Sequence, residues 1–387
     1  MTSRPDNQFA PDYASPPGST LLEAIEARGM TQAELAERAG RSKKHINEII
    51  KGKQPITPEM ALQLERVLGV SAGFWNNRQR DYDEALARIA ERKRLTGSVG
   101  WNREFPYREM VKSGWVKDTN DKVGRLTSLL GFFGVAGIDE WEARWSSLGV
   151  SFRKSPAFQS NRYAVAAWLR AGETMAQQAA TSPYDSGGFR SALASVRTLT
   201  ASDPSAVVPR MTSLCANAGV ALAFVPELTG AHVYGATQWL TPDKALIQLS
   251  LRGKTDDHLW FAFFHEAGHI LKHGKKDRFI EATGDLKTSD ACEKEADRFA
   301  CDFLIPPRGY ETFVNRGAFD EAAILAFARK VRVAPGIVVG RLQHDKKVAH
   351  SRHQLLKRRF TLARPETGSQ MSRVPPPASR RAVSREQ

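Results

Sequence analysis

The chain has few cysteines, no long apolar run and no surplus of acidic residues. Three cysteines among 387 residues are too few for a disulfide framework, and no Cys-x-x-Cys pair is present to bind zinc. No stretch approaches 18 consecutive apolar residues, and residues 1–20 lack the hydrophobic core of a secretion signal. These absences argue against membrane-spanning and disulfide-stapled classes. We expect a soluble, cytoplasmic protein with no membrane partner.

Basic residues exceed acidic ones. The chain has 56 Lys and Arg against 42 Asp and Glu, which gives a formal net charge of +14. Such a surplus favours an acidic partner, of which nucleic acid is the first to consider. The length predicts two or three domains.

A His-Glu-x-x-His box begins at His265. His265 and His269 are four residues apart, so on a helix both imidazoles lie on one face and can reach one metal ion. Glu266 follows the first histidine and is placed to act as general base toward an attacking water. The residues around the box are apolar on nearly every face, which predicts a buried helix over 255–274. The alternative is a pair of hydrogen-bonded core histidines.

A zinc ion needs a third protein ligand, and residues 292–304 supply the candidates. Their apolar residues recur at helical spacing, and two prolines end the segment. Glu293 and Asp297 are four residues apart and share a face, whereas Glu295 points elsewhere. We predict Glu293 as the third ligand, and Asp297 as the acceptor of the remaining N–H of a ligating histidine. Alternatively, both are solvated acids that pair with neighbouring basic residues.

His273 follows the box closely and needs separate consideration. It comes eight positions after the first histidine of the box. Metzincins place a third histidine ten positions after the first, following a glycine that turns the chain, and here Lys272 stands where that glycine would be. We therefore predict that His273 is a poor ligand.

Several motifs together resemble the ImmA/IrrE-type zinc metallopeptidases. They are His265-Glu266-Ala267-Gly268-His269, Glu293-x-Glu-Ala-Asp297-x-Phe-Ala and Leu304-Ile305-Pro306. Residues 334–343 resemble the end of that domain, so the resemblance covers roughly residues 205–350. It implies a small gluzincin-like fold with a short sheet, a metal helix and a glutamate helix. It also implies a Zn²⁺ cofactor and endopeptidase activity on repressor proteins of DNA-binding type. Strand-like patterns at 220–225, 231–240 and 244–251 predict a three-stranded sheet before the metal helix.

The first 80 residues carry a different pattern. Residues 31–34 form a capping box, residues 39–42 a tight turn, and residues 43–51 a third helix closed by Gly52. Short helices joined by such a turn predict a helix-turn-helix whose third helix enters the major groove. The residues predicted to contact DNA phosphates and base edges are Ser42, Lys43, Lys44 and Asn47. The alternative is a helical bundle with a solvated basic face.

Residues 17–85 resemble an XRE-type DNA-binding domain of the HigA-antitoxin kind. The residues that carry this resemblance are Asn47-Glu48-Ile49-Ile50-Lys51-Gly52-Lys53, Pro55-Ile56-Thr57-Pro58 and Phe74-Trp75. It implies a double-stranded DNA operator as partner. If the protein is a homodimer, as we expect, the operator should be palindromic, with half-sites about one helical turn apart. The resemblance leaves open a toxin that the protein neutralises by binding.

The expected fold is therefore α+β and mostly helical. We expect a flexible arm at 1–18, a five-helix DNA-binding domain at 19–80, a helical middle at 81–203, a metallopeptidase-like domain at 204–350 and a disordered basic tail at 363–387. A charged connecting helix should follow the fifth helix near residue 82. The expected function is that of a DNA-binding regulator with a zinc endopeptidase domain that cleaves a repressor or another regulatory protein. A repressor with an idle zinc site and an antitoxin stay open as alternatives.

Overall fold

The computed structural model describes residues 13–152, 161–202, 204–250, 255–275, 279–282 and 291–359. The chain divides into two compact units, Met1–Ala136 and Gly137–Gln387, and each is described by itself. The division falls inside the segment 81–203, and the predicted domain boundaries remain predictions. Most of the predicted arm and all of the predicted tail at 363–387 lie outside the described residues.

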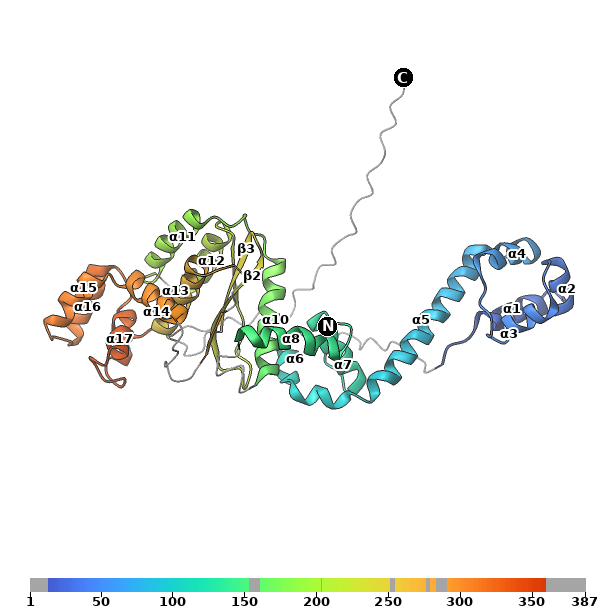
Figure 1. Cartoon of the computed structure of the whole chain (residues 1–387), viewed down its shortest axis with the longest axis horizontal. Helices are drawn as coiled ribbons and strands as arrows, with labels where there is room; N and C mark the ends of the chain where they lie inside the picture. Colours follow the sequence, from blue (N-terminus) through green and yellow to red (C-terminus); the bar gives the residue numbers. More distant parts are fainter. Residues whose placement is uncertain are drawn as a thin grey trace, which may run out of the picture. The chain divides into compact units, whose positions relative to one another are not determined.

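The first unit is helical in the part that the structure describes. Its helices are α1 (Pro17–Glu26), α2 (Gln32–Arg38), α3 (Lys43–Ile50), α4 (Pro58–Leu68), α5 (Ala72–Thr96), the 3-10 helix η1 (Val99–Glu104), α6 (Tyr107–Lys112) and α7 (Lys122–Phe133) (Figure 1). A serine or threonine caps each of α2 to α5, and its hydroxyl oxygen accepts a bond from the backbone N–H three residues later. Leu21, Ile46 and Trp75 are fully buried and pack into one core, which holds α1 to α5 together.

Helix α5 differs from the expectation. The sequence predicts a fifth helix around Phe74 and Trp75 and a separate connecting helix after it, but the structure joins both into one helix of 25 residues. No proline interrupts the segment, and ion pairs one turn apart, such as that of Arg88 with Glu84, support its exposed part. The prediction of two separate helices is therefore wrong.

The second unit surrounds a small sheet. Its elements are α8 (Ile138–Phe152), α10 (Arg162–Gln178), α11 (Ser186–Leu199), α12 (Pro204–Ala216), β1 (Val220–Phe224), β2 (Val233–Thr241), β3 (Lys244–Leu249), α13 (Asp256–Lys272), β4 (Phe279–Ala282), α14 (Ala291–Leu304), α15 (Pro307–Asn315), α16 (Glu321–Val331), α17 (Pro335–His344) and the 3-10 helix η2 (Gln354–Leu356). The strand order is β1-β3-β2-β4. β1 runs parallel to β3, and β2 runs antiparallel to both of its neighbours.

The three strands expected before the metal helix are confirmed, and β4 is an addition. β4 has four residues, which is too short for an alternating pattern to stand out in the sequence. The predicted helical middle and the mostly helical α+β class are confirmed as well.

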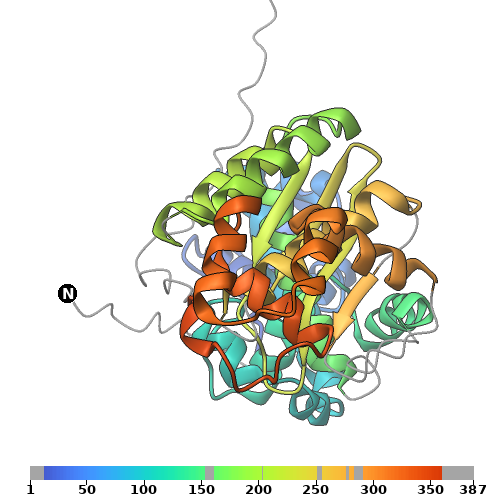
Figure 2. The ribbon, with the colours of Figure 1, turned by 90° about the vertical axis from the view of Figure 1, so that its left-hand side faces the viewer.

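Helices cover both faces of the sheet. On one face, Gln248 of β3 donates from Nε2 to the carbonyl oxygen of Trp168 in α10 at 2.6 Å. Its neighbours Ile247 and Leu249 point the other way, into the core that contains Trp260 and Phe263 of α13. In Figure 2 the helices near the C-terminus, coloured orange to red, lie in front of the strands. Helix α13 is therefore central, and its predicted burial is confirmed.

The start of α13 is tied to a distant segment of the chain. Asp256 is fully buried, and its carboxylate accepts bonds from the backbone N–H and the Nε–H of Arg358 at 3.2 and 3.3 Å. Lys357 donates from Nζ to Asp257 at 2.6 Å. These paired charges fix the first turn of the helix that carries the His-Glu-x-x-His box.

Candidate metal centre and candidate nucleic-acid interface

The two histidines of the box lie on one buried face of α13. His265 and His269 are each 2% exposed, and their Nε2 atoms are 3.0 Å apart. The one-turn spacing on the helix produces this approach, as the sequence predicts. Both rings present the same nitrogen to the same point, an arrangement that can bind one metal ion.

Helix α14 brings a carboxylate to that point. Glu293 Oε2 lies 3.1 Å from His265 Nε2 and 3.6 Å from His269 Nε2. The two helices can approach because Gly268 faces α14, where an added Cβ would lie 3.2 Å from the Cα of Ala296. A larger residue at Gly268 would push α14, and with it Glu293, away from the histidines.

The donor set fits a zinc ion in its distances and its chemistry. Ligand distances of about 2.0–2.2 Å in a tetrahedral site imply that donor atoms lie about 3.3 Å from one another. The three separations observed here, 3.0, 3.1 and 3.6 Å, bracket that value. Two imidazole nitrogens and one carboxylate oxygen make up a group of three donors that can hold a metal and leave a fourth position open.

The protonation states of these groups also suit metal binding. Burial, the largest cause, lowers the pKa of His269 to about 4. Burial acts to raise the pKa of Glu293, but hydrogen bonds with His265 and His269 outweigh it and lower this pKa to about 2. At neutral pH the site therefore presents a neutral His269 and an ionised Glu293, which are the forms that bind metal.

Asp297 lies behind His265. Its Oδ1 is 2.9 Å from His265 Nδ1, so the ring donates its Nδ1–H to the carboxylate and directs the Nε2 lone pair toward Glu293 and His269. The structure thus brings together Glu293 and Asp297, which the sequence places on one face of a helix. Their roles toward a metal remain a prediction.

Glu266 faces the sheet rather than solvent. It is fully buried, and its Oε2 accepts a hydrogen bond from Thr237 Oγ1 on β2 at 2.5 Å. Gly235, two residues earlier on the strand, leaves room for the carboxylate. Thr237 and Gly235 are not among the predicted site residues, because nothing in the sequence indicates which strand residues lie beneath α13.

The predicted DNA-contacting residues lie at the start of α3. Ser42, Lys43 and Lys44 are exposed, and the Ser42 hydroxyl oxygen also caps the helix by accepting the N–H of His45 at 3.1 Å. Asn47 is half-buried, and its Nδ2 donates to Gln32 Oε1 at the start of α2, 3.2 Å away. Gln32, which is not among the predicted DNA-contacting residues, therefore belongs to the same surface.

Two family models match these two regions of the chain. Residues 21–75 match the model described as helix-turn-helix. Residues 225–343 match that of peptidase family M78, described as the IrrE N-terminal-like domain. The chain carries a helix-turn-helix domain and an IrrE N-terminal-like domain. Both resemblances seen in the sequence are thereby confirmed.

Three solved structures are similar to parts of the chain. One is a putative antidote protein of a plasmid maintenance system from Nostoc punctiforme, with 26% identity, a TM-score of 0.21 and coverage of 22% of this chain and 93% of that one. Another is a HigA-family addiction module antidote protein from Coxiella burnetii, with 27% identity, a TM-score of 0.20 and coverage of 22% and 92%. The third, the Pseudomonas aeruginosa antitoxin HigA with the higBA promoter, has 31% identity, a TM-score of 0.21 and coverage of 21% and 91%. No curated protein gives a significant match.

The donor residues and the general-base candidate all lie within the IrrE N-terminal-like domain, which spans 225–343, and so does Thr237. Ser42, Lys43, Lys44 and Asn47 lie within the helix-turn-helix domain at 21–75. The chain thus combines a DNA-binding type of domain with a domain of a peptidase family. Among the described residues, no helix combines the length and apolar character needed to cross a bilayer.

Proposed function

We propose that the protein is a DNA-binding regulator whose IrrE N-terminal-like domain is a zinc-dependent endopeptidase. Its expected substrate is a repressor or another regulatory protein. The observation that carries the proposal is the meeting of His265 Nε2, His269 Nε2 and Glu293 Oε2 within 4.8 Å of one another. The two histidines lie on the same helix as the buried Glu266, and Glu293 comes from α14. A bound Zn²⁺ would polarise the peptide carbonyl and make water a better nucleophile.

The residues around the proposed metal have different roles in the reaction. His265, His269 and Glu293 would bind the ion, and Asp297 would orient His265 through its Nδ1–H. Glu266 would take a proton from the attacking water and pass it to the nitrogen of the leaving amine. Thr237 holds the Glu266 carboxylate by one oxygen, which restricts its rotation and keeps it ready to accept that proton.

The DNA-binding part of the proposal rests on the exposed start of α3. Ser42, Lys43 and Lys44 are suited to phosphate oxygens, and the amides of Asn47 and Gln32 are suited to base edges. A homodimer would place two such surfaces on a palindromic operator, with half-sites about one helical turn apart.

A comparison of purified wild type with Glu266→Gln tests the peptidase. Glutamine keeps the shape of the side chain but cannot take a proton, so the loss of general-base assistance should slow cleavage by about 10²–10⁴-fold. Each protein, loaded with Zn²⁺, is incubated with a cell extract, and new protein N-termini are identified by mass spectrometry. Glu321→Gln, on the exposed start of α16, is the matched acid-to-amide control. Zinc content is measured in all three.

The outcomes separate an enzyme from a binding protein. N-termini that appear with wild type and Glu321→Gln, but not with Glu266→Gln at equal zinc content, would support the endopeptidase. If wild type produces no N-termini beyond those of Glu266→Gln and both regulate a reporter equally, the proposal fails. The alternative of a repressor or HigA-like antitoxin with a non-catalytic zinc site would then replace it.

A further inference from the structure

A third histidine, His273, contacts His269 at the ring nitrogen that faces away from Glu293. His273 Nδ1 lies 2.9 Å from His269 Nδ1, while His269 Nε2 lies 3.0 Å from the Nε2 of His265. A backbone hydrogen bond holds the two residues one helical turn apart, because the N–H of His273 donates to the His269 carbonyl oxygen at 3.1 Å. His273 therefore contacts the ring nitrogen of His269 that does not point to the proposed metal.

The proton on His269 decides what this contact does. A neutral imidazole carries one N–H, and the nitrogen that binds a metal must offer its lone pair. If His269 binds through Nε2, its proton sits on Nδ1 and is donated to His273 Nδ1. His273 then acts as acceptor at Nδ1 and carries its own proton on Nε2, so a single direction of donation satisfies both Nδ1 atoms.

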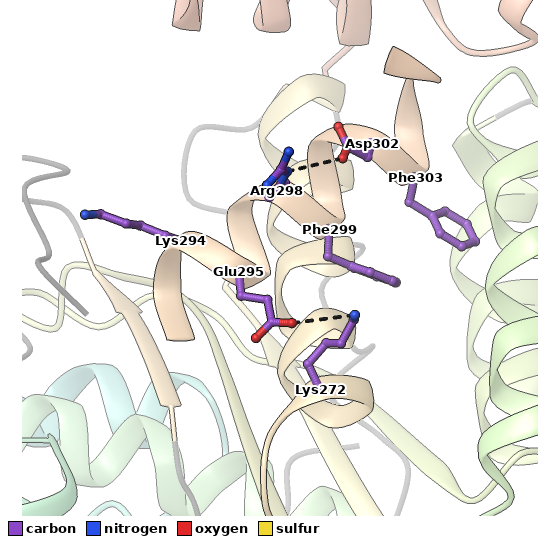
Figure 3. A pocket seen from close by; sticks show the side chains of 7 residues that line it. All are labelled: Lys272, Lys294, Glu295, Arg298, Phe299, Asp302 and Phe303. Atoms are coloured by element: carbon purple, nitrogen blue, oxygen red, sulfur yellow. Dashed lines mark ion pairs between the residues drawn. The ribbon is translucent and has the colours of Figure 1, made fainter. Parts of the chain in front are cut away.

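Glu295 closes the chain of contacts. Its Oε2 lies 3.5 Å from His273 Nε2, and its Oε1 lies 3.5 Å from Lys272 Nζ. Figure 3 shows Glu295 reaching from α14 toward Lys272 at the end of α13. A carboxylate near Nε2 favours the tautomer of His273 that has its proton there. Glu295 is exposed and its contact with His273 is long, so its contribution should be smaller than that of His273.

Packing holds both imidazoles in place. The ring of Phe279 on β4 is stacked on that of His269, with centroids 3.8 Å apart and planes at 13°. The same phenylalanine ring lies 5.1 Å from that of His273. The two imidazoles thus cannot turn freely, and the distance between their Nδ1 atoms is set by the fold.

We propose that His273, assisted by Glu295, is a positioning residue that fixes the Nδ1–H tautomer of His269 and so directs its Nε2 lone pair toward the metal. Asp297 has the same position relative to His265. Each ligating histidine thus has its own acceptor: a carboxylate for His265 and a second imidazole for His269. This inference rests on the proposed metal site.

Three substitutions test which atom of His273 matters. His273→Leu removes the hydrogen-bond acceptor but leaves a side chain that can pack against Phe279. His273→Asn places an amide oxygen near the position of Nδ1, whereas His273→Gln places its amide group near the position of Nε2. The affinity of the full-length protein for Zn²⁺ alone is measured by competition with a chelator. The leucine and glutamine variants should bind about 10–100-fold more weakly, and the asparagine variant within about threefold of wild type.

A spectroscopic readout accompanies the affinities. Long-range ¹H–¹⁵N correlation spectra of the zinc-loaded wild type should show His269 protonated at Nδ1 and His273 protonated at Nε2. A proton on His273 Nδ1, or a metal-bound nitrogen in His273, would overturn the inference. Circular dichroism establishes that each variant is folded before its affinity is compared.

The measured zinc affinities distinguish a failure of this inference from a failure of the proposed metal site on which it rests. If wild type binds no Zn²⁺, the proposed metal centre itself fails. If wild type binds Zn²⁺ and the leucine and glutamine variants bind it equally well, only the role of His273 fails. An equal loss in all three variants would also overturn it, because rescue by asparagine is what separates a hydrogen-bond acceptor from packing.

Discussion

Gly235 of β2 lies directly against the carboxylate of Glu266, so closely that a Cβ on Gly235 would stand 2.6 Å from Glu266 Oε1 and 2.9 Å from its Cγ. A methyl group cannot occupy that space unless the carboxylate moves. The glycine therefore fixes where the proposed general base can lie, and Thr237, two residues later, fixes its other oxygen.

Gly235→Ala should displace Glu266 without removing a metal ligand. A misplacement of about 1 Å in a reacting group can lower the rate by about 10²-fold. We expect kcat/KM to fall by that order on a substrate identified by its new N-terminus, while zinc content stays at the wild-type value. Gly131→Ala on α7, where an added Cβ meets nothing within 4 Å, is the matched control and should retain full activity. Unchanged activity in Gly235→Ala would show that Glu266 does not act from this position.

Glu293→Ala and Glu295→Ala should differ in their affinity for zinc. Glu293 Oε2 lies 3.1 Å from His265 Nε2, whereas Glu295 contacts His273 and Lys272. Loss of a direct ligand should weaken Zn²⁺ binding by roughly 100-fold or more. Loss of the more distant Glu295 should weaken it by less than about tenfold. Equal losses, measured by chelator competition, would mean that the ligand has been assigned to the wrong residue of α14.

Part of this site could be predicted from the sequence. The spacing of His265 and His269 places them on one helical face, and the same spacing links Glu293 with Asp297, because an α-helix returns to the same side every four residues. These are local relationships. Helical spacing also predicts that Glu295 points away from the face that Glu293 and Asp297 share, and in the structure Glu295 lies toward His273.

The rest depends on packing between segments far apart in the chain. Thr237 and Gly235 meet Glu266 only because β2 pairs with β3 in one register and α13 crosses that face of the sheet. Strand register depends on tertiary contacts, so the identity of a single residue does not reveal which residue lies opposite it. The contact of His273 with His269 could have been suspected from their four-residue spacing, but not the nitrogen through which it is made.

The stability of the metal-free protein should fall as the pH is lowered. Burial lowers the pKa of His269 from 6.5 to about 4 in the folded state. Between these values the unfolded chain binds more protons than the native state, so the free energy of unfolding rises with pH and is lost on acidification. This histidine alone should account for roughly 3 kcal/mol across that range. Urea unfolding of chelator-treated protein at about pH 7 and about pH 5, a window that covers only part of that range, should show a loss of roughly 2 kcal/mol from this histidine. His269→Gln should lose less over the same range, and an equal loss would assign the effect to other groups.

Operator binding should depend on the start of α3. Replacing Lys43, Lys44 and Asn47 together with alanine should abolish sequence-specific binding, because the exposed lysines are suited to phosphates and the amide of Asn47, held by Gln32, is suited to a base edge. Affinity should fall steeply with salt in wild type. If each lysine contacts a phosphate, Lys43→Ala with Lys44→Ala should reduce the logarithmic salt slope by about two.

Asn47→Ala by itself separates base readout from charge. It should cost about 1–3 kcal/mol on the best operator and relax the preference at one base pair, with the salt slope unchanged. Lys112→Ala with Lys117→Ala removes the same charge from exposed positions outside the helix-turn-helix domain and should leave operator affinity near wild type. Fluorescence anisotropy on operators selected from a random library gives the affinities of wild type and the four variants. Zinc content, measured in each, shows whether the second unit is unchanged. If the triple variant binds the operator as tightly as wild type, the residues that read the DNA lie outside the start of α3.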